Sequence, residues 1–434
     1  MSHDELLRRH RAVMPRWLAL YYDEPIEFAS GKGRHVIDAD GRSYLDFFGG
    51  ILTNALGYDV AAVSDAIRRQ VGTGVLHSST LYLIREQVAL AERIAELSGI
   101  DDAKVFFTNS GTEANEAALL LATQARRSNQ VLALRNSYHG RAFATMGVTG
   151  NRGWSASALS PVNVSYVHGG YRYRSPFRDL PDADYIRACT DDLREIIETT
   201  TAGDVACMIA EPIQGVGGFT TPPDGLFTAF KEVLDEYGIL FVSDEVQTGW
   251  GRTGEHFWGY AAHGVTPDAL TFAKGLGNGL AIGGVVARAE LMDCLTANSI
   301  STFGGNPLAT AGARAALEYV LDHDLQANAA RQGGRLRAGL RELAGTVGII
   351  GDVRGKGLML AVELVEPGTT TPSPQAATAV LEATKAAGLL VGKGGLYGNV
   401  IRIAPPMTLT DDETEEGLAT LRTVLTDVNQ QPAR

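Results

Sequence analysis

Leu270-Thr271-Phe272-Ala273-Lys274-Gly275-Leu276-Gly277 is the stretch of sequence that decides the fold. It is a short apolar run that ends in a lysine followed by small residues. Upstream, a second apolar run, Gly238-Ile239-Leu240-Phe241-Val242-Ser243, ends in Asp244-Glu245-Val246. Short apolar runs of this kind are typical of strands that are buried on both faces. The pattern therefore places a lysine at one strand end and an aspartate at another.

From about residue 60 onward, helical patterns alternate with short apolar runs. Helices are expected at 84–98, 112–126 and 224–237, and strands at 104–108, 130–134, 205–210 and before Asp244. This alternation predicts an α/β protein with a mostly parallel central sheet covered by helices on both faces.

Both ends of the chain have a different pattern. Residues 5–20 have helical spacing, and 33–46 form a predicted hairpin around Asp40-Gly41. After residue 308 come a long Ala-rich helical stretch, a strand at 358–364, a loop at 366–375, a Gly-rich turn at 392–398 and a strand at 400–403. We expect a large domain at 60–308 and a smaller α+β domain built from 1–59 and 309–434.

Composition limits the classes of protein and partner. The chain has 434 residues, 45% hydrophobic and 20% charged, with a formal net charge of −12. A strongly acidic protein is a poor match for nucleic acid. The three cysteines, Cys189, Cys207 and Cys294, show no CxxC spacing, so we expect neither disulfides nor a metal site. The sequence shows no signal peptide and no membrane-spanning run, and we expect a cytoplasmic protein.

Asn109-Ser110-Gly111-Thr112-Glu113 joins a predicted strand to a predicted helix. Ser110 and Glu113 match the capping-box pattern, and Gly111 allows a ligand to approach the backbone closely. Free N–H groups at a helix start, beside the hydroxyls of Ser110 and Thr112, favour a phosphate dianion. An ordinary helix cap is the alternative if this segment is considered alone.

Together with a phosphate site, the lysine and aspartate suit pyridoxal phosphate (PLP). Lys274 would bind the cofactor's aldehyde, and Asp244 would pair with its ring nitrogen. At ~4 Å and an effective dielectric of ~20, that attraction is ~4 kcal/mol, or roughly three pKa units. The alternatives are a loop lysine and a helix cap or surface ion pair for Asp244. The other lysines considered are in turns or on an exposed-looking helix: Lys32, Lys231, Lys356 and Lys393.

Several motifs resemble the class III (ω-amino acid) aminotransferases of PLP fold type I. They are residues 109–116, Tyr138-His139-Gly140-Arg141, Glu211-Pro212-Ile213-Gln214-Gly215, 244–249, Lys274 and Thr302-Phe303-Gly304-Gly305-Asn306-Pro307. The stretches 351–359, 388–392 and 402–406 resemble the alanine–glyoxylate (β-amino acid) group within that class. The resemblance covers nearly the whole chain in the right order.

The resemblance implies a role for each matching residue. Tyr138 would stack on the cofactor ring, Val246 would press on its other face, and Gln247 would bind its phenolic oxygen. Ser110, Gly111 and Thr112 would hold the phosphate, joined by Thr302 of a second subunit, which implies a homodimer with sites at its interface. His139 would be structural rather than a catalytic base. Arg402 would bind the substrate carboxylate, Glu211 would pair with Arg402 when no carboxylate is bound, and Arg141 would be a second carboxylate site.

The implied activity is ping-pong transfer of an amino group from a β- or ω-amino acid, or alanine, to pyruvate, glyoxylate or 2-oxoglutarate. Alternatives are a 4-aminobutyrate (GABA)- or acetylornithine-type enzyme using 2-oxoglutarate, and a PLP decarboxylase or aminomutase. A non-catalytic binding or regulatory protein on the same scaffold is a further alternative, which intact Lys274 and Asp244 argue against. One segment departs from the family pattern: Leu56-Gly57-Tyr58-Asp59-Val60 stands where Gly-His-x-His-Pro is frequent.

Overall fold

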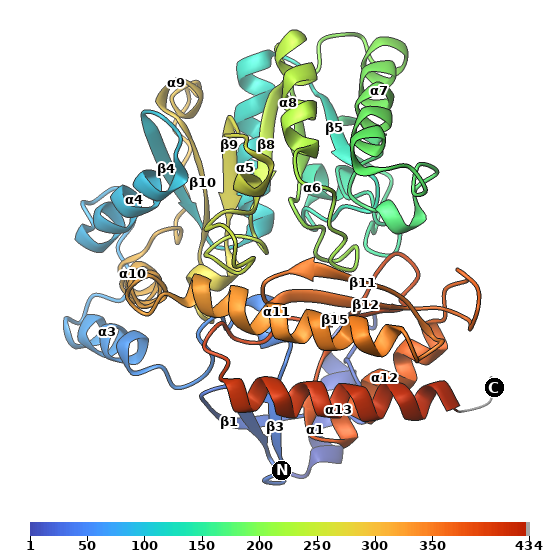
Figure 1. The fold of residues 1–434 in the computed structure, drawn as a ribbon. Coiled ribbons are helices and arrows are strands. Elements are labelled where there is room, and N and C mark those ends of the chain that lie inside the picture. Colours follow the sequence, from blue (N-terminus) through green and yellow to red (C-terminus); the bar gives the residue numbers. More distant parts are fainter. Residues whose placement is uncertain (431–434) are drawn as a thin grey trace.

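A seven-stranded sheet forms the centre of the larger part of the protein, in a computed structural model that describes residues 1–430 (Figure 1). Its strands, in spatial order, are β4 (Ala103–Thr108), β10 (Gly283–Arg288), β9 (Ala269–Phe272), β8 (Leu240–Asp244), β7 (Cys207–Ala210), β5 (Gln130–Leu134) and β6 (Asn163–Val167). β10 runs antiparallel to both its neighbours, and the other neighbouring pairs are parallel. The predicted mostly parallel sheet is confirmed.

Helices cover both faces of this sheet. Successive residues of β5 point to opposite faces, so Val131 and Ala133 join one apolar cluster while Leu132 and Leu134 join another. The first cluster is completed by α5 (Gly111–Arg126), and the second by α4 (Arg85–Ser98), α7 (Asp182–Thr200) and α8 (Leu226–Glu236). The strands β5, β7, β8 and β9 are buried along almost their whole length, which explains why their sequences are almost continuously apolar.

A second sheet joins the two ends of the chain. It contains β1 (Phe28–Lys32), β2 (His35–Asp38), β3 (Ser43–Asp46) and β13 (Leu389–Leu390). The hairpin predicted around Asp40-Gly41 connects β2 to β3, and Gly41 has the positive φ of +84° that the turn requires. Because β13 pairs in parallel with β3, the N-terminal hairpin and the C-terminal part of the chain share one sheet.

A third sheet contains β11 (Ile350–Lys356), β12 (Met359–Leu364), β15 (Val400–Ile403) and β14 (Gly392–Gly394). The prediction of a turn over 392–398 is wrong at its start, because 392–394 form a strand paired with β15. A Cβ on Gly392 would lie 2.3 Å from the Phe48 ring. This glycine is therefore needed for close packing rather than for chain reversal.

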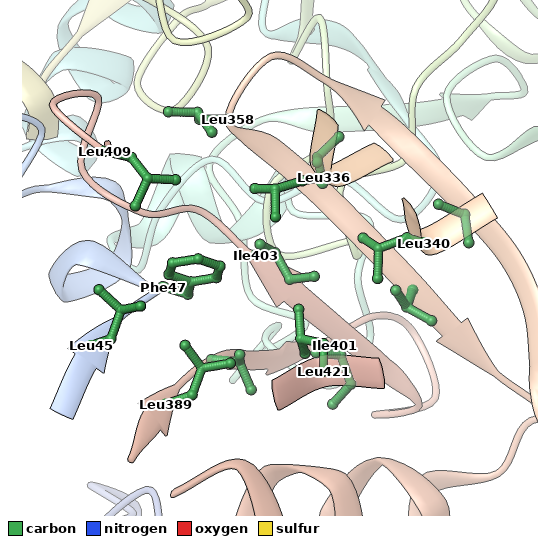
Figure 2. Close-up of a cluster of buried hydrophobic side chains, with 14 of the residues drawn as sticks. Leu45, Phe47, Leu336, Leu340, Leu358, Leu389, Ile401, Ile403, Leu409 and Leu421 are labelled. Atoms are coloured by element: carbon green, nitrogen blue, oxygen red, sulfur yellow. The ribbon is translucent and has the colours of Figure 1, made fainter. Parts of the chain in front are cut away.

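Figure 2 shows the apolar core that the two smaller sheets share with the C-terminal helices. Leu45 and Phe47 come from the N-terminal segment. They belong to one cluster with Leu336 and Leu340 of α11 (Leu325–Ala344) and Leu421 of α13 (Asp411–Gln430). The chain ends are thus held together by buried side chains as well as by strand pairing.

The remaining helices are shorter or lie outside these sheets. They are α1 (His3–Val13), α2 (Gly49–Leu52), α3 (Ala61–Gly72), α6 (Phe143–Gly147), α9 (Ala289–Met292), α10 (Pro307–Asp322) and α12 (Pro374–Ala386), with single 3₁₀ turns at Arg172–Arg174, Gly259–His263 and Lys274–Leu276. The helical pattern over 5–20 ends at Val13, two residues before Pro15, which disfavours helix at the preceding residue. Within residues 1–430, none of the helices combines the length and the apolarity needed to cross a bilayer.

Candidate active site

A cavity of about 450 Å³ lies where the strands of the large sheet end. Asp244 is the last residue of β8, Lys274 follows β9 by two residues, and Glu211 directly follows β7. Open α/β sheets bind ligands at the carboxyl ends of their strands. The lining includes ten residues predicted for the site: Ser110, Gly111, Thr112, Tyr138, Glu211, Asp244, Val246, Gln247, Lys274 and Arg402.

Lys274 is held in an unusual conformation. Its φ is +43°, in the left-handed region that costs a non-glycine residue about 1–3 kcal/mol. The indole N–H of Trp250 donates to the carbonyl of Ala273 at 3.2 Å and so fixes the residue before it. Burial lowers the pKa of the Lys274 amine to about 8, although Asp244 and Glu211 raise it and Arg402 lowers it further. A larger share of the amine is therefore neutral, and able to attack a carbonyl, than in an ordinary lysine.

Three groups orient the Asp244 carboxylate. Asn115 Nδ2 donates to Oδ2 at 2.7 Å, His139 Nδ1 lies 2.8 Å from the same oxygen, and the Val246 N–H donates to Oδ1 at 3.1 Å. His139 is fully enclosed, and its Nε2 has no partner among the described residues. This contact with Asp244 is the kind expected of a structural, hydrogen-bonded histidine. Asn115, on α5, was not singled out from the sequence.

The turn after β8 is fixed by a buried carboxylate. Glu245 is 0% exposed and accepts hydrogen bonds from Thr248 Oγ1 at 2.6 Å and from the N–H groups of Gly259 and Tyr260, both at 2.8 Å. Such bonds satisfy a buried charge and rigidify the backbone around it. Glu245 therefore sets the directions in which its neighbours, Asp244 and Val246, enter the cavity.

The N-terminus of α5 opens into the same cavity. Ser110 caps the helix by accepting from the Glu113 N–H at 3.2 Å. Glu113 reaches back to the Asn109 N–H at 3.1 Å, one residue earlier than in the standard capping box. A Cβ on Gly111 would lie 2.9 Å from both methyl carbons of Val246. The first N–H groups of a helix lack partners within it, so they are available to an anion.

Tyr138 and Gln247 complete the walls. The Tyr138 ring meets the Trp154 ring edge-on, with centroids 5.6 Å apart. Gln247 is 6% exposed, and its Oε1 has no hydrogen-bond partner among the described residues. A buried polar atom without a protein partner in a cavity indicates a site that holds a polar ligand or water. Trp154 was not identified from the sequence, since its loop carries no motif.

Arg402 is a buried cation in the lining of the cavity. It lies on β15, is 4% exposed, and donates to the Lys393 carbonyl at 2.9 Å and to the Gly215 carbonyl at 3.4 Å. Its guanidinium carbon lies 4.9 Å from the centroid of the Phe48 ring. Burial lowers the pKa of Arg402, and its Nε has no partner within residues 1–430.

Glu211 lies in the same cavity but is bound differently from the prediction. It accepts from the N–H groups of Tyr138 and Gly215, both at 2.8 Å, and burial raises its pKa. Across residues 1–430, no ion pair joins Glu211 to Arg402. The two side chains are connected through Gly215 instead, whose N–H binds one and whose carbonyl binds the other.

Comparison with known proteins agrees with this geometry. Residues 21–425 match the sequence model of the family described as aminotransferase class-III. The chain belongs to the class III aminotransferases. It is 38% identical over 416 residues to alanine–glyoxylate aminotransferase 2 homolog 2, mitochondrial, of Arabidopsis thaliana, covering 95% of this chain and 86% of that protein.

Two further relatives belong beside it. The acetylornithine aminotransferase of Corynebacterium efficiens is 38% identical, with 95% of each chain covered. The solved structure of a thermostable (S)-enantioselective omega-transaminase from Thermomicrobium roseum superposes with a TM-score of 0.91 at 31% identity, covering 99% of both chains. The protein therefore has PLP fold type I and is a PLP-dependent aminotransferase.

Two predicted residues of this class III aminotransferase do not line the cavity of their own chain. Arg141 is exposed, and its guanidinium carbon lies 5.3 Å from the centroid of the Trp17 ring. Thr302 is exposed beside Ser301 and Phe303. The prediction for Thr302 assigns it to the site of a second subunit, so its position in one chain leaves that prediction standing.

The segment that departs from the family pattern, residues 56–60, is connected to the cavity wall through Tyr58. The Tyr58 hydroxyl donates to Asp46 Oδ2 at 2.7 Å, and the N–H groups of Phe48 and Gly49 donate to Asp46 Oδ1 at 2.8 and 2.9 Å. Asp46 is 3% exposed. Tyr58 thereby helps to fix the backbone that leads to Ile51, which lines the cavity.

Proposed function

We propose that the protein transfers an amino group from a β- or ω-amino acid, or alanine, to pyruvate, glyoxylate or 2-oxoglutarate by a ping-pong mechanism. The observation that carries the proposal is the enclosure of Lys274, Asp244 and Arg402 in one cavity. The names of the relatives, an alanine–glyoxylate and an acetylornithine aminotransferase, agree with this range of substrates.

The residues present fit PLP. Ser110, Gly111 and Thr112 would hold its phosphate at the start of α5, and Asp244 would bind its ring nitrogen. Tyr138 and Val246 would contact the two faces of the ring, and Gln247 would donate to its phenolic oxygen. The space left by Gly111 supports this arrangement. When bound, the cofactor draws electrons from the substrate carbon that carries the amino group.

Lys274 has two tasks in the proposal. Its neutral amine would hold the cofactor through the aldehyde. The same amine, once free, would take up and return the proton that the donor carbon loses. A pKa near 8 suits both tasks, because the amine exchanges a proton readily at neutral pH. Asp244 keeps the ring nitrogen protonated through these steps.

Arg402 would bind the substrate carboxylate. A guanidinium binds a carboxylate through two parallel N–H···O bonds, and burial strengthens such a contact. The unpartnered Nε supports this role, since its N–H is free to donate to a carboxylate oxygen. Glu211 would offset the charge of Arg402 when no carboxylate is present, which its connection through Gly215 and its raising effect on the pKa of Arg402 support. Arg141 would add a second carboxylate contact after leaving the Trp17 ring, which its guanidinium contacts in this structure.

A homodimer completes the proposal. Two segments, 77–83 and 300–303, expose large apolar side chains. They are Leu81 at 67%, Leu83 at 99%, Ile300 at 48% and Phe303 at 61% exposure. The two segments are in contact, because the rings of His77 and Phe303 are 4.9 Å apart. Large exposed apolar side chains on adjoining segments favour a protein interface. Covering them with a second copy would bring Thr302 to the partner's phosphate site.

We also propose two domains and a cytoplasmic location for the protein. The parallel pairing of β13 with β3 supports a small domain from 1–59 and 309–434 beside a large domain at 60–308. Three unpaired cysteines, two of them buried, support a cytoplasmic protein.

A matrix of donors and acceptors on the purified, PLP-loaded protein tests the substrate assignment. Alanine, β-alanine, 4-aminobutyrate and N-acetylornithine would be paired with pyruvate, glyoxylate and 2-oxoglutarate, with the amino product measured. Arg402→Leu is expected to impair carboxylated donors at least ~10-fold more than α-methylbenzylamine, which has no carboxylate. Equal losses would contradict the role of Arg402. Release of carbon dioxide without amino transfer would assign a decarboxylase instead.

A further inference from the structure

A second cavity, of about 630 Å³, lies apart from the active site and shares none of its lining residues. Its walls come from the segment 170–179 before α7, the threonines at 220–221, the helix α11 and the strand β11. Figure 1 places β11 on the side of the third sheet that faces the large sheet. The volume falls within the range of pockets that hold small metabolites.

This cavity is rich in cations. Its lining contains two acidic residues, Asp179 and Asp352, against six basic ones: Arg172, Arg178, Arg337, Arg341, Arg354 and Lys356. The whole chain, by contrast, has a net charge of −12. Cations in a concave surface attract small anions where no carboxylate neutralises them.

Four of the six cations have acidic partners. Arg172 pairs with Asp182, Arg178 with Asp179, Arg354 with Asp352 and Glu363, and Lys356 with Asp224 and Glu255. Within residues 1–430, Arg337 and Arg341 have no ion pair. They stand four residues apart on α11, where like charges repel. Arg337 Nη1 donates a long hydrogen bond, of 3.4 Å, to the Gly355 carbonyl. Two uncompensated cations therefore face one cavity.

Arg354 connects this cavity to the active site. It is 9% exposed and donates from Nε to the Gly218 carbonyl at 2.9 Å. Gly218 belongs to the turn in which Gly215 binds both Glu211 and Arg402. Val216, in the same turn, lines the active site. One short turn is thus in contact with Arg354 on one side and with the carboxylate-binding residues on the other.

The guanidinium of Arg354 is positioned by charge. Its Nη1 lies 2.8 Å from Asp352 and 2.6 Å from the fully buried Glu363, while its Nη2 is buried with no hydrogen-bond partner among the described residues. Negative charge added to the cavity would compete with these carboxylates for Arg354. It would thereby change the hydrogen bond that Arg354 donates to the Gly218 carbonyl.

We propose that this cavity is a second anion site, which binds a small metabolite with two or more negative charges. Arg337 and Arg341 supply the free positive charge. Occupancy alters the affinity of the active site for carboxylated substrates through Arg354 and the turn at 215–218. Both phosphate esters and polycarboxylates carry the required charge, so inorganic pyrophosphate and citrate serve as probes of the two kinds.

The binding experiment uses the PLP-loaded protein with its active site closed by aminooxyacetate. Calorimetric titration with pyrophosphate and with citrate compares wild type with the double variant Arg337→Ser/Arg341→Ser. The matched control is Arg68→Ser/Arg69→Ser, which removes the same charge from two exposed arginines on α3. We expect the cavity variant to lose at least ~10-fold in affinity, as truncation of charged partners does, while the control matches wild type. Equal affinity in all three proteins, or no binding to wild type, overturns the site.

The kinetic experiment tests the connection. Pyrophosphate or citrate is expected to change the KM for a carboxylated donor several-fold, roughly 3-fold or more for a coupling of ordinary size. The KM for α-methylbenzylamine, which has no carboxylate, should stay unchanged. The cavity variant should show no response to either anion. Binding without any change in KM overturns the connection. Binding is measured without turnover, so its result is independent of the proposed aminotransferase substrates.

Discussion

The low pKa of Lys274 predicts how fast the cofactor-free protein captures PLP. Burial lowers this pKa from 10.5 to about 8. At pH 7.5, about one quarter of such an amine is neutral, against about 0.1% of an ordinary lysine. Only the neutral amine attacks the aldehyde, so the protein should react roughly 250 times faster than a free lysine of equal intrinsic reactivity at this pH.

The assay measures the rate of covalent attachment as a function of pH. Cofactor-free protein is mixed with PLP, trapped with borohydride at set times, and the peptide containing Lys274 is quantified by mass spectrometry. The initial rate should rise about tenfold per pH unit below pH 7 and level off above about pH 9. N-acetyl-lysine methylamide, a free model amine, is the control, and its rate should keep rising to about pH 10.

Two variants should shift the pKa of Lys274 in opposite directions. Arg402 lowers the pKa of Lys274 and Glu211 raises it, so Arg402→Leu should move the midpoint up and Glu211→Gln should move it down. A rate that climbs tenfold per unit through pH 9 in wild type would refute the argument. Shifts of the same sign in both variants would show that the two charges do not act on this amine.

Three further predictions concern stability and cofactor affinity. Lys274→Met should stabilise the cofactor-free protein by about 3 kcal/mol at pH 7. The lowered amine pKa of Lys274 costs folding free energy below pH 8, and this cost disappears by about pH 10.5. Urea unfolding of both proteins at pH 7 and 10.5 measures it, and the same difference in unfolding free energy at both pH values would contradict it. Gly111→Ala should raise the Kd for PLP at least ~10-fold, because the new Cβ would press on Val246 in the cavity wall. Gly72→Ala is the control, since a Cβ there meets open space. Equal Kd values for the two variants would contradict this effect. Tyr58→Phe should cost about 1–3 kcal/mol in unfolding free energy because Asp46 stays buried with one bond fewer; an unchanged value would show that Asp46 is satisfied without it.

The large sheet was predictable because its signals are local. The strand expected at 104–108 is β4 (Ala103–Thr108), and the helix expected at 112–126 is α5 (Gly111–Arg126). Buried parallel strands are continuously apolar, and the helix begins with a serine cap, so each element is encoded in its own residues. Lys274 and Asp244 were found for the same reason, because Asp244 ends such a strand and Lys274 follows one by two residues.

Other features depend on contacts between distant residues, and no local pattern announces them. Gly392 is a glycine because of the Phe48 ring, far away in sequence, so its segment resembled a turn. Asn115 lies on an ordinary Ala-rich helix, and its role is visible only when Asp244 is placed beside it. The same holds for Trp154 beside Tyr138, and for Gly215, which takes the place of the expected direct contact between Glu211 and Arg402.

The position of Arg402 explains why this contact through Gly215 matters. Lys274 and Asp244 belong to the large sheet, whereas Arg402 belongs to β15 of the third sheet. In the proposed mechanism, the distance between the Lys274 amine and a carboxylate on Arg402 would therefore be set by how the two sheets are held together, not by either sheet alone. Gly215 makes that connection at the site itself. A change that displaces its turn would alter the fit of carboxylated substrates while leaving the cofactor's contacts on the large sheet in place.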